Sequence, residues 1–84
     1  NDIMSTVLIT GGSRGIGAAC VEKFAAAGDR VLFLYRQNDE AAQALCKRTG
    51  AVAFRCDVGD KDAVKAFFEN LSEPVDVLVN TKFL

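Results

Sequence analysis

The sequence predicts an α/β domain whose strands form a doubly wound parallel sheet. Short apolar runs alternate with stretches whose apolar residues recur at helical spacing, in the order β-α-β-α-β-α-β. The runs are apolar throughout, which is typical of parallel strands that helices cover on both faces. The intervening helices are long enough to cross the sheet, so right-handed crossovers are expected. We therefore expect the strand order 3-2-1-4.

The first strand is expected at residues 7–9 (Val-Leu-Ile) and the second at residues 31–35 (Val-Leu-Phe-Leu-Tyr). The helix between them is expected at residues 15–27, and Gly28 with Asp29 marks its end. Five apolar residues recur there at helical spacing: Ile16, Ala19, Cys20, Phe24 and Ala27.

A second helix is expected to begin at a cap formed by Asn38 or Asp39 and to run through Arg48, with Gly50 ending it. A weaker third strand, nearer a sheet edge, is expected at residues 51–56. The apolar residues of this helix share one face and are Ala41, Ala42, Leu45 and Cys46.

A third helix is expected to begin at a cap formed by Asp60 and to run through Leu71. Pro74 breaks the chain before the fourth strand, residues 75–79, which the strand order places at an open sheet edge. The apolar face of this helix consists of Val64, Phe67, Phe68 and Leu71.

Length and composition limit the classes of function that are possible. The 84 residues allow one small domain, 1–84, and residues 1–3 are interpreted as an addition ahead of a natural start at Met4. A net charge of −1 argues against nucleic acid and acidic membranes as partners. The chain has no histidine, which excludes a Ser-His-Asp triad, a Cys-His pair and a histidine-ligated metal within it.

The three cysteines follow no CxxC spacing, so neither a disulfide framework nor a zinc site is expected. Cys20 and Cys46 fall in helical stretches, where they are interpreted as small buried hydrophobic residues. No stretch has the layout of a signal peptide or the length of a membrane span. These features predict a cytoplasmic protein.

Residues 10–17, TGGSRGIG, place Gly11, Gly12, Gly15 and Gly17 between the first strand and the first helix. Glycines here allow a tight turn, close approach of a ligand and close packing of the helix. The amides at the helix N-terminus then cradle a pyrophosphate, as in a Rossmann-type dinucleotide-binding domain. A simple turn is the alternative, and the missing Gly-Lys-Ser/Thr excludes a Walker A loop.

The end of the second strand predicts which dinucleotide is bound. An acidic residue there binds the ribose of NAD, whereas an arginine accepts the 2′-phosphate of NADP. The chain has Tyr35 and Arg36 at this point, and Arg14 in the glycine turn could reach the same phosphate. NADP(H) is therefore predicted in preference to NAD.

After the third strand, Asp57 could accept the adenine amine and Val58 could cover the adenine ring. Alternatively, Asp57 could only close the turn before the third helix.

These residues together resemble the classical short-chain dehydrogenase/reductase family. Residues 10–17 look like its TGxxxGIG motif, Asp57-Val58 like its adenine-contacting pair, and residues 77–80 (Val-Leu-Val-Asn) like the strand before its NNAG motif. Residues 34–36 are similar to NADPH-dependent members such as the 3-oxoacyl-[acyl-carrier-protein] reductases. The resemblance implies these cofactor-binding residues: Gly11, Ser13, Arg14, Gly15, Ile16, Gly17, Tyr35, Arg36, Asp57, Val58 and Asn80.

The resemblance ends after Asn80, where the chain reads Thr81-Lys82-Phe83-Leu84 in place of Asn-Ala-Gly. The family's catalytic Ser, Tyr and Lys would belong to a missing half, and Tyr35 is not that tyrosine because Asp39 follows it at the lysine position. The chain alone is therefore expected to be inactive and, at its open edge, partly unfolded or self-associating. The complete protein is expected to be a homo-oligomer, a dimer or tetramer, that acts on a carbonyl or alcohol substrate. The alternatives are a non-catalytic dinucleotide-binding module or sensor, and a fragment that binds nothing.

Overall fold

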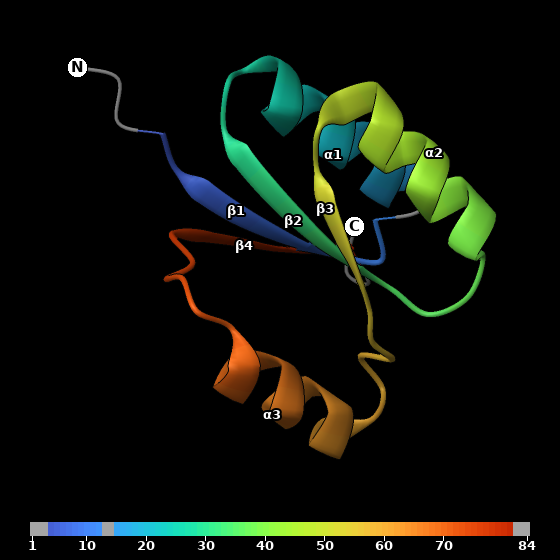
Figure 1. Cartoon of the computed structure of the whole chain (residues 1–84), viewed down its shortest axis with the longest axis vertical. Coiled ribbons are helices and arrows are strands. Elements are labelled where there is room, and N and C mark those ends of the chain that lie inside the picture. Colours follow the sequence, from blue (N-terminus) through green and yellow to red (C-terminus); the bar gives the residue numbers. More distant parts are fainter. Residues whose placement is uncertain (1–3, 13–14, 82–84) are drawn as a thin grey trace.

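A computed structural model describes residues 4–12 and 15–81. Its strands pair in parallel in the order β3-β2-β1-β4, which confirms the predicted fold class and strand order. Helices α1 and α2 lie on one side of the sheet and α3 on the other (Figure 1). The elements are β1 (Thr6–Thr10), α1 (Gly15–Ala26), β2 (Arg30–Tyr35), α2 (Asp39–Thr49), β3 (Val52–Arg55), α3 (Lys61–Asn70) and β4 (Val77–Asn80).

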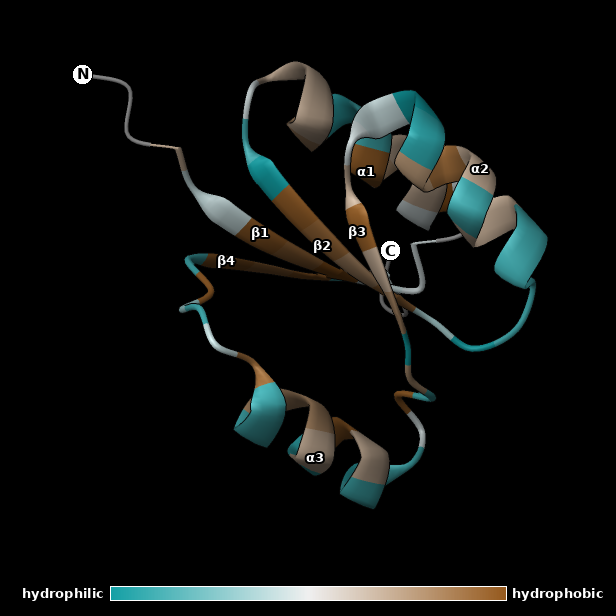
Figure 2. Cartoon of the chain, in the orientation of Figure 1, coloured by the Kyte–Doolittle hydropathy of each residue, from teal (hydrophilic) through white to brown (hydrophobic). Residues whose placement is uncertain are grey.

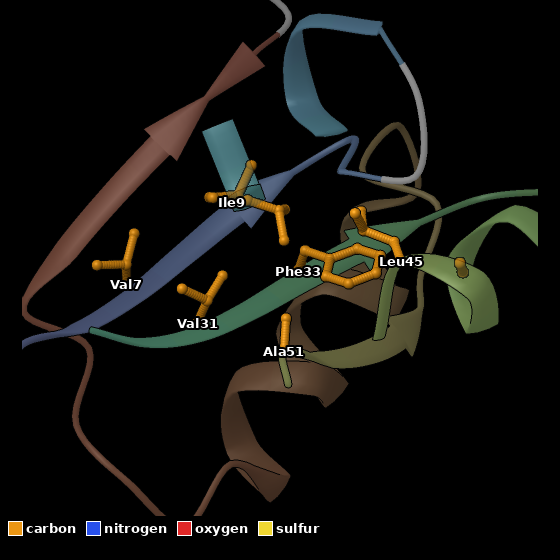
Figure 3. Packing of buried hydrophobic residues seen from close by; sticks show 8 residues of the cluster. Val7, Ile9, Val31, Phe33, Leu45 and Ala51 are labelled. Carbon is orange, nitrogen blue, oxygen red and sulfur yellow. The ribbon is translucent and has the colours of Figure 1, made fainter. Parts of the chain in front are cut away.

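Two hydrophobic clusters flank the sheet, because successive residues of each strand face opposite sides. In β2, Val31 and Phe33 belong to the cluster beneath α1 and α2, whereas Leu32 and Leu34 belong to the cluster on the α3 side. Figure 3 shows Phe33 beside Leu45 of α2, within the first cluster. All four β2 residues are buried, as the continuous apolar run predicts.

The helix caps follow from specific side chains. The Asn38 side chain accepts a hydrogen bond from the Ala41 amide at 3.1 Å, so Asn38 rather than Asp39 caps α2. Gly50 ends this helix at φ 81°, a left-handed conformation that favours glycine. Asp60 caps α3 by accepting from the amides of Asp62 and Ala63. These three ends are as predicted from the sequence.

The buried face of α1 contains only part of the apolar pattern seen in the sequence. Gly17 and Val21 are the buried residues of this helix, whereas Ile16 is 55% exposed. Ala19 and Ala27 are also exposed. Close contact of Gly17 with the glycine turn fixes the rotation of the helix about its axis, and this turns Ile16 away from the sheet.

Several smaller predictions are also corrected. Phe68 is exposed rather than packed on the sheet, and Cys20 and Cys46 are only half-buried. Strand β4 begins at Val77 instead of residue 75, because Asp76 lies in the preceding loop, where its carboxylate accepts from the Thr6 amide at 2.7 Å. Strand β3 begins at residue 52 and ends at Arg55, one residue inside each end of the expected strand.

The surface pattern follows the fold. Figure 2 shows hydrophobic residues along the strands and hydrophilic residues on the outer sides of α2 and α3. Among the strands of the described chain, β4 pairs only with β1, and Leu78 on β4 is 58% exposed. The open edge predicted for the fourth strand is therefore present. No helix among the described elements has the length and hydrophobicity to cross a membrane.

Candidate functional site

A cavity of about 290 Å³ lies at the carboxyl ends of the strands, where ligands bind in open α/β sheets. It brings together five residues that the sequence singled out: Gly11, Tyr35, Arg36, Asp57 and Val58. Gly15, Ile16, Gly17 and Asn80 are not part of its lining, and Ser13 and Arg14 lie outside the described residues.

The glycines of the β1–α1 turn are required for different physical reasons. Gly11 has φ 70°, and a Cβ there would lie 2.8 Å from Thr81 Oγ1. Gly15 has φ 63° and open space where a Cβ would point. A Cβ on Gly17 would collide with the Gly11 carbonyl oxygen and Gly12 Cα, so Gly17 lets α1 pack against the turn. Only Gly15 leaves open space for a ligand.

Hydrogen bonds hold the end of β4 against this turn. Thr81 Oγ1 donates to the Thr10 carbonyl at 2.5 Å, and the Thr81 amide donates to Thr10 Oγ1 at 3.3 Å. Asn80 Oδ1 lies 3.2 Å from Thr10 Oγ1 and accepts a hydrogen bond from it. Asn80 therefore helps to hold the end of β4 against Thr10, directly before the glycine turn. The sequence did not indicate this role.

Asp57 closes a turn and also lines the cavity. Its Oδ1 accepts from the Gly59 amide at 2.9 Å, and its carbonyl accepts from the Asp60 amide at 2.9 Å. The structure thus contains the turn that was the competing interpretation, while Asp57 and Val58 remain at the cavity wall. Burial raises the pKa of the neighbouring Cys56 thiol, and the charges of Asp57 and Asp60 raise it further, so this thiol stays protonated at neutral pH.

Arg36 is an exposed cation at the cavity wall. It makes no hydrogen bond or ion pair with any residue that the structure describes. Its guanidinium is therefore available to a ligand, in contrast to Arg30, which pairs with Glu73, and Arg48, which pairs with Glu22.

Tyr35 donates a hydrogen bond from its hydroxyl to Asp39 Oδ1 at 2.7 Å. This bond, together with burial and the negative charge of Asp39, raises the pKa of the phenol. Arg55 lies on the other side of the same carboxylate, with Nη1 3.3 Å from Asp39 Oδ2. The sequence indicated Asp39 as a candidate helix cap and excluded a catalytic role for Tyr35 through it, but it assigned no role to Arg55. The four-residue spacing of Tyr35 and Asp39 was the available signal.

A second cavity, of about 470 Å³, lies between β3 and α3. Its wall includes Phe54 and Phe67, whose rings meet edge to face at 5.1 Å, and it includes none of the turn glycines. Within residues 4–12 and 15–81, no group of three or more Cys, Asp or Glu side chains is placed to hold a metal ion.

Comparison with known proteins places these features in one family. The family model described as short chain dehydrogenase matches residues 5–81. The cyclic-di-GMP-binding biofilm dispersal mediator protein of Escherichia coli K12 is 52% identical over 59 residues, which cover 70% of this chain and 25% of that protein. The acetoacetyl-CoA reductase of Paracoccus denitrificans is 43% identical over 76 residues, which cover 87% of this chain and 31% of that protein.

Solved structures agree in fold. The crystal structure of BdcA, an E. coli protein, in complex with NADPH has a TM-score of 0.83 and 46% sequence identity to this chain. The match covers 90% of this chain and 31% of BdcA. The chain thus spans between a quarter and a third of the length of these relatives.

Proposed function

This chain belongs to the short-chain dehydrogenase family, and from that premise we propose that it is the NADP(H)-binding portion of an oxidoreductase. One observation carries the proposal. The cavity at the carboxyl ends of the strands collects Gly11, Arg36, Asp57 and Val58, which supply a turn, a cation, a hydrogen-bond acceptor and an apolar cover. On this proposal the whole chain is one partial dinucleotide-binding domain.

The described residues fit a bound dinucleotide phosphate. The first turn of α1 holds no acidic residue, whereas α2 and α3 both carry acidic residues in their first turns. The positive end of the α1 dipole is therefore left without a carboxylate to compete with an anion. Gly15 adds open space at this helix start, so backbone and ligand can approach closely. The pyrophosphate would bind at this turn.

Arg36 would hold the 2′-phosphate that distinguishes NADP(H) from NAD(H). An arginine forms a charge-assisted hydrogen bond with a phosphate, and Arg36 has no carboxylate partner among the described residues that it must first leave. Tyr35 occupies the position where an acidic residue would bind the ribose of NAD, and its raised pKa keeps the phenol neutral at physiological pH. BdcA, the structural neighbour solved with NADPH, supports this cofactor.

At the far end of the cavity, Asp57 Oδ2 would accept the adenine amine while Oδ1 keeps its bond to Gly59. Val58, which is 43% exposed, would lose water contact by covering the adenine ring. The bound cofactor supplies a hydride for reduction of a carbonyl or accepts one from a hydroxyl.

We propose a 3-oxoacyl thioester as the substrate class of the complete protein. Acetoacetyl-CoA, which the Paracoccus relative is named for reducing, is such a thioester. The chain's own residues would bind and orient the cofactor, and the catalytic Ser, Tyr and Lys would come from outside this chain. The homo-oligomeric state and the cytoplasmic location stay predictions.

Substitution of Arg36 tests the cofactor assignment. In the complete protein, Arg36→Ala should weaken NADPH binding by about 1.5–3 kcal/mol, the contribution of a hydrogen bond to a charged group, and leave NADH binding nearly unchanged. Titration of each cofactor, followed by its fluorescence, gives both dissociation constants. Arg48→Ala is the matched control, since Arg48 is an exposed arginine whose pairing with Glu22 lies on the helices rather than at the cavity. Equal losses for NADPH and NADH would refute the assignment.

A second function is favoured by one relative. The E. coli protein that is 52% identical over 59 residues is named for binding cyclic-di-GMP and not for a reaction. The same phosphate-binding turn could therefore serve a non-catalytic dinucleotide sensor. Adding cyclic-di-GMP to the NADPH complex separates the two functions. If the chain is a sensor, cyclic-di-GMP should displace NADPH at comparable concentrations of the two ligands. If the chain belongs to an oxidoreductase, cyclic-di-GMP should not displace NADPH.

A further inference from the structure

The side chains of Tyr35, Asp39 and Arg55 meet at the edge of the cofactor cavity. Tyr35 and Arg55 are paired in the β2–β3 register, so their side chains lie side by side on the same face of the sheet. Both reach the carboxylate of Asp39 at the start of α2, at 2.7 Å and 3.3 Å. We name these three residues the rim cluster.

The rim cluster is connected directly to the cavity wall. Tyr35 lines the cavity, and the Cys56 amide, one residue after Arg55, donates to the Tyr35 carbonyl at 2.8 Å. The carboxylate of Asp39 is thus one hydrogen bond away from Tyr35, a residue of the cavity wall that directly precedes Arg36 in the chain. Its only ion-pair partner among the described residues is Arg55.

From this geometry, and resting on the proposed function, we infer that Asp39 and Arg55 set the discrimination between NADP(H) and NAD(H). Asp39 holds the Tyr35 side chain in place through its hydrogen bond to the hydroxyl. The negative charge of Asp39 opposes a phosphate bound at Arg36. Arg55 offsets that charge. Both residues act on the ligand through charge and position, without contact with the reacting atoms.

Opposite effects of the two substitutions follow from this arrangement. The 2′-phosphate carries nearly two negative charges at neutral pH, and NADH lacks it. Asp39→Asn removes a repelling charge, so NADPH should bind about three- to fivefold more tightly, with NADH unchanged. Arg55→Met leaves Asp39 uncompensated, so NADPH should bind about three- to fivefold more weakly. Both effects should shrink at high salt, because the side chains of the pair are more than half exposed.

Tyr35 provides a readout that needs no cofactor. The 84-residue chain has no other tyrosine and no tryptophan, so ultraviolet absorbance of the phenolate in this chain reports on Tyr35 alone. The charged or titratable groups that act on it are Asp39 and Cys46, which raise its pKa, and Arg55, which lowers it. Asp39→Asn should therefore lower the pKa of Tyr35, and Arg55→Met should raise it.

The experiment measures NADPH and NADH dissociation constants and the Tyr35 titration for both variants, with circular dichroism to establish folding. Glu22→Gln and Arg48→Met are matched controls, because that pair has similar exposure but lies away from the cavity. These controls should change neither cofactor preference nor the tyrosine titration. Equal changes for NADPH and NADH, or weaker NADPH binding in both rim variants, would overturn the inference and leave the proposed function standing. A wild-type protein that binds neither cofactor would overturn both.

Discussion

Replacing Gly17 by valine tests the packing that shapes the phosphate-binding turn. Gly17 is buried in the first turn of α1, and any Cβ there would collide with the Gly11 carbonyl and Gly12 Cα. These obstacles are backbone atoms, so they cannot rotate away as a side chain would. The helix must move outward from β1, or the turn must change its conformation.

The expected change in the free energy of unfolding of Gly17→Val follows from two opposing effects. Overpacking a close-packed interior costs about 1–3 kcal/mol, and backbone obstacles place this variant near the upper end. Valine has better helix propensity than glycine and offsets about 0.4 kcal/mol. The free energy of unfolding should thus fall by about 2–3 kcal/mol, which lowers the folding equilibrium constant roughly 30- to 150-fold. NADPH binding should be abolished, because the displaced turn no longer presents its amides to the pyrophosphate.

Urea denaturation of Gly17→Val and Ala19→Val measures the effect. Ala19 is exposed on the same helix, so its substitution reports helix propensity without a collision and should cost about 0.5 kcal/mol. NADPH titration of both variants gives the effect on binding. Equal unfolding midpoints would refute the tight approach of α1 to the turn. Near-normal NADPH binding by Gly17→Val would refute the phosphate-cradle role of this turn.

Other predictions concern the cap, an ion pair and the open edge. Asn38→Ala should lower the free energy of unfolding by about 1–2 kcal/mol in urea denaturation, because it removes the α2 cap and strains a residue at φ 55°, whereas Asn38→Gly should cost much less. Hydrogen bonds from Arg30 lower the pKa of Glu73 from 4.5, so the pair stabilises the fold above that pH and is lost as pH falls through the lowered value. Glu73→Gln should flatten this acid-side decrease in thermal stability, and an unchanged profile would exclude the pair as its source. Leu78→Lys should reduce the mass of the chain in light scattering toward the monomer, since a charge on an edge strand blocks strand pairing, and equal masses would contradict association through β4.

The strand order was predictable because the strands are short, mainly apolar segments that alternate with helices whose ends are marked in the sequence. Asn38, Gly50 and Asp60 act at the ends where the sequence placed them. The buried face of α1 was not predictable in the same way, because several small apolar residues fit a helical stripe equally well. Contact between Gly17 and the turn decides which stripe is buried, and that contact depends on tertiary structure.

Some residues of the candidate site were likewise predictable from the sequence, and others depend on tertiary structure. Arg36, Asp57 and Val58 follow strands directly, and parallel strands bring their carboxyl ends to one edge, so the sequence could place them in one cavity. Arg55 could not be assigned to the rim, because its position beside Tyr35 depends on the β2–β3 register. The role of Asn80 likewise required knowing that β4 pairs with β1 and ends beside Thr10.

The most direct test of the NADP(H) assignment is a nuclear magnetic resonance titration of the isotopically labelled protein with NADPH. We expect the largest amide shift changes at Gly11, Arg36 and Val58, around the 290 Å³ cavity. Residues of the β3–α3 cavity such as Phe67 should change little. Shift changes centred on the β3–α3 cavity, or none at saturating NADPH, would contradict the account.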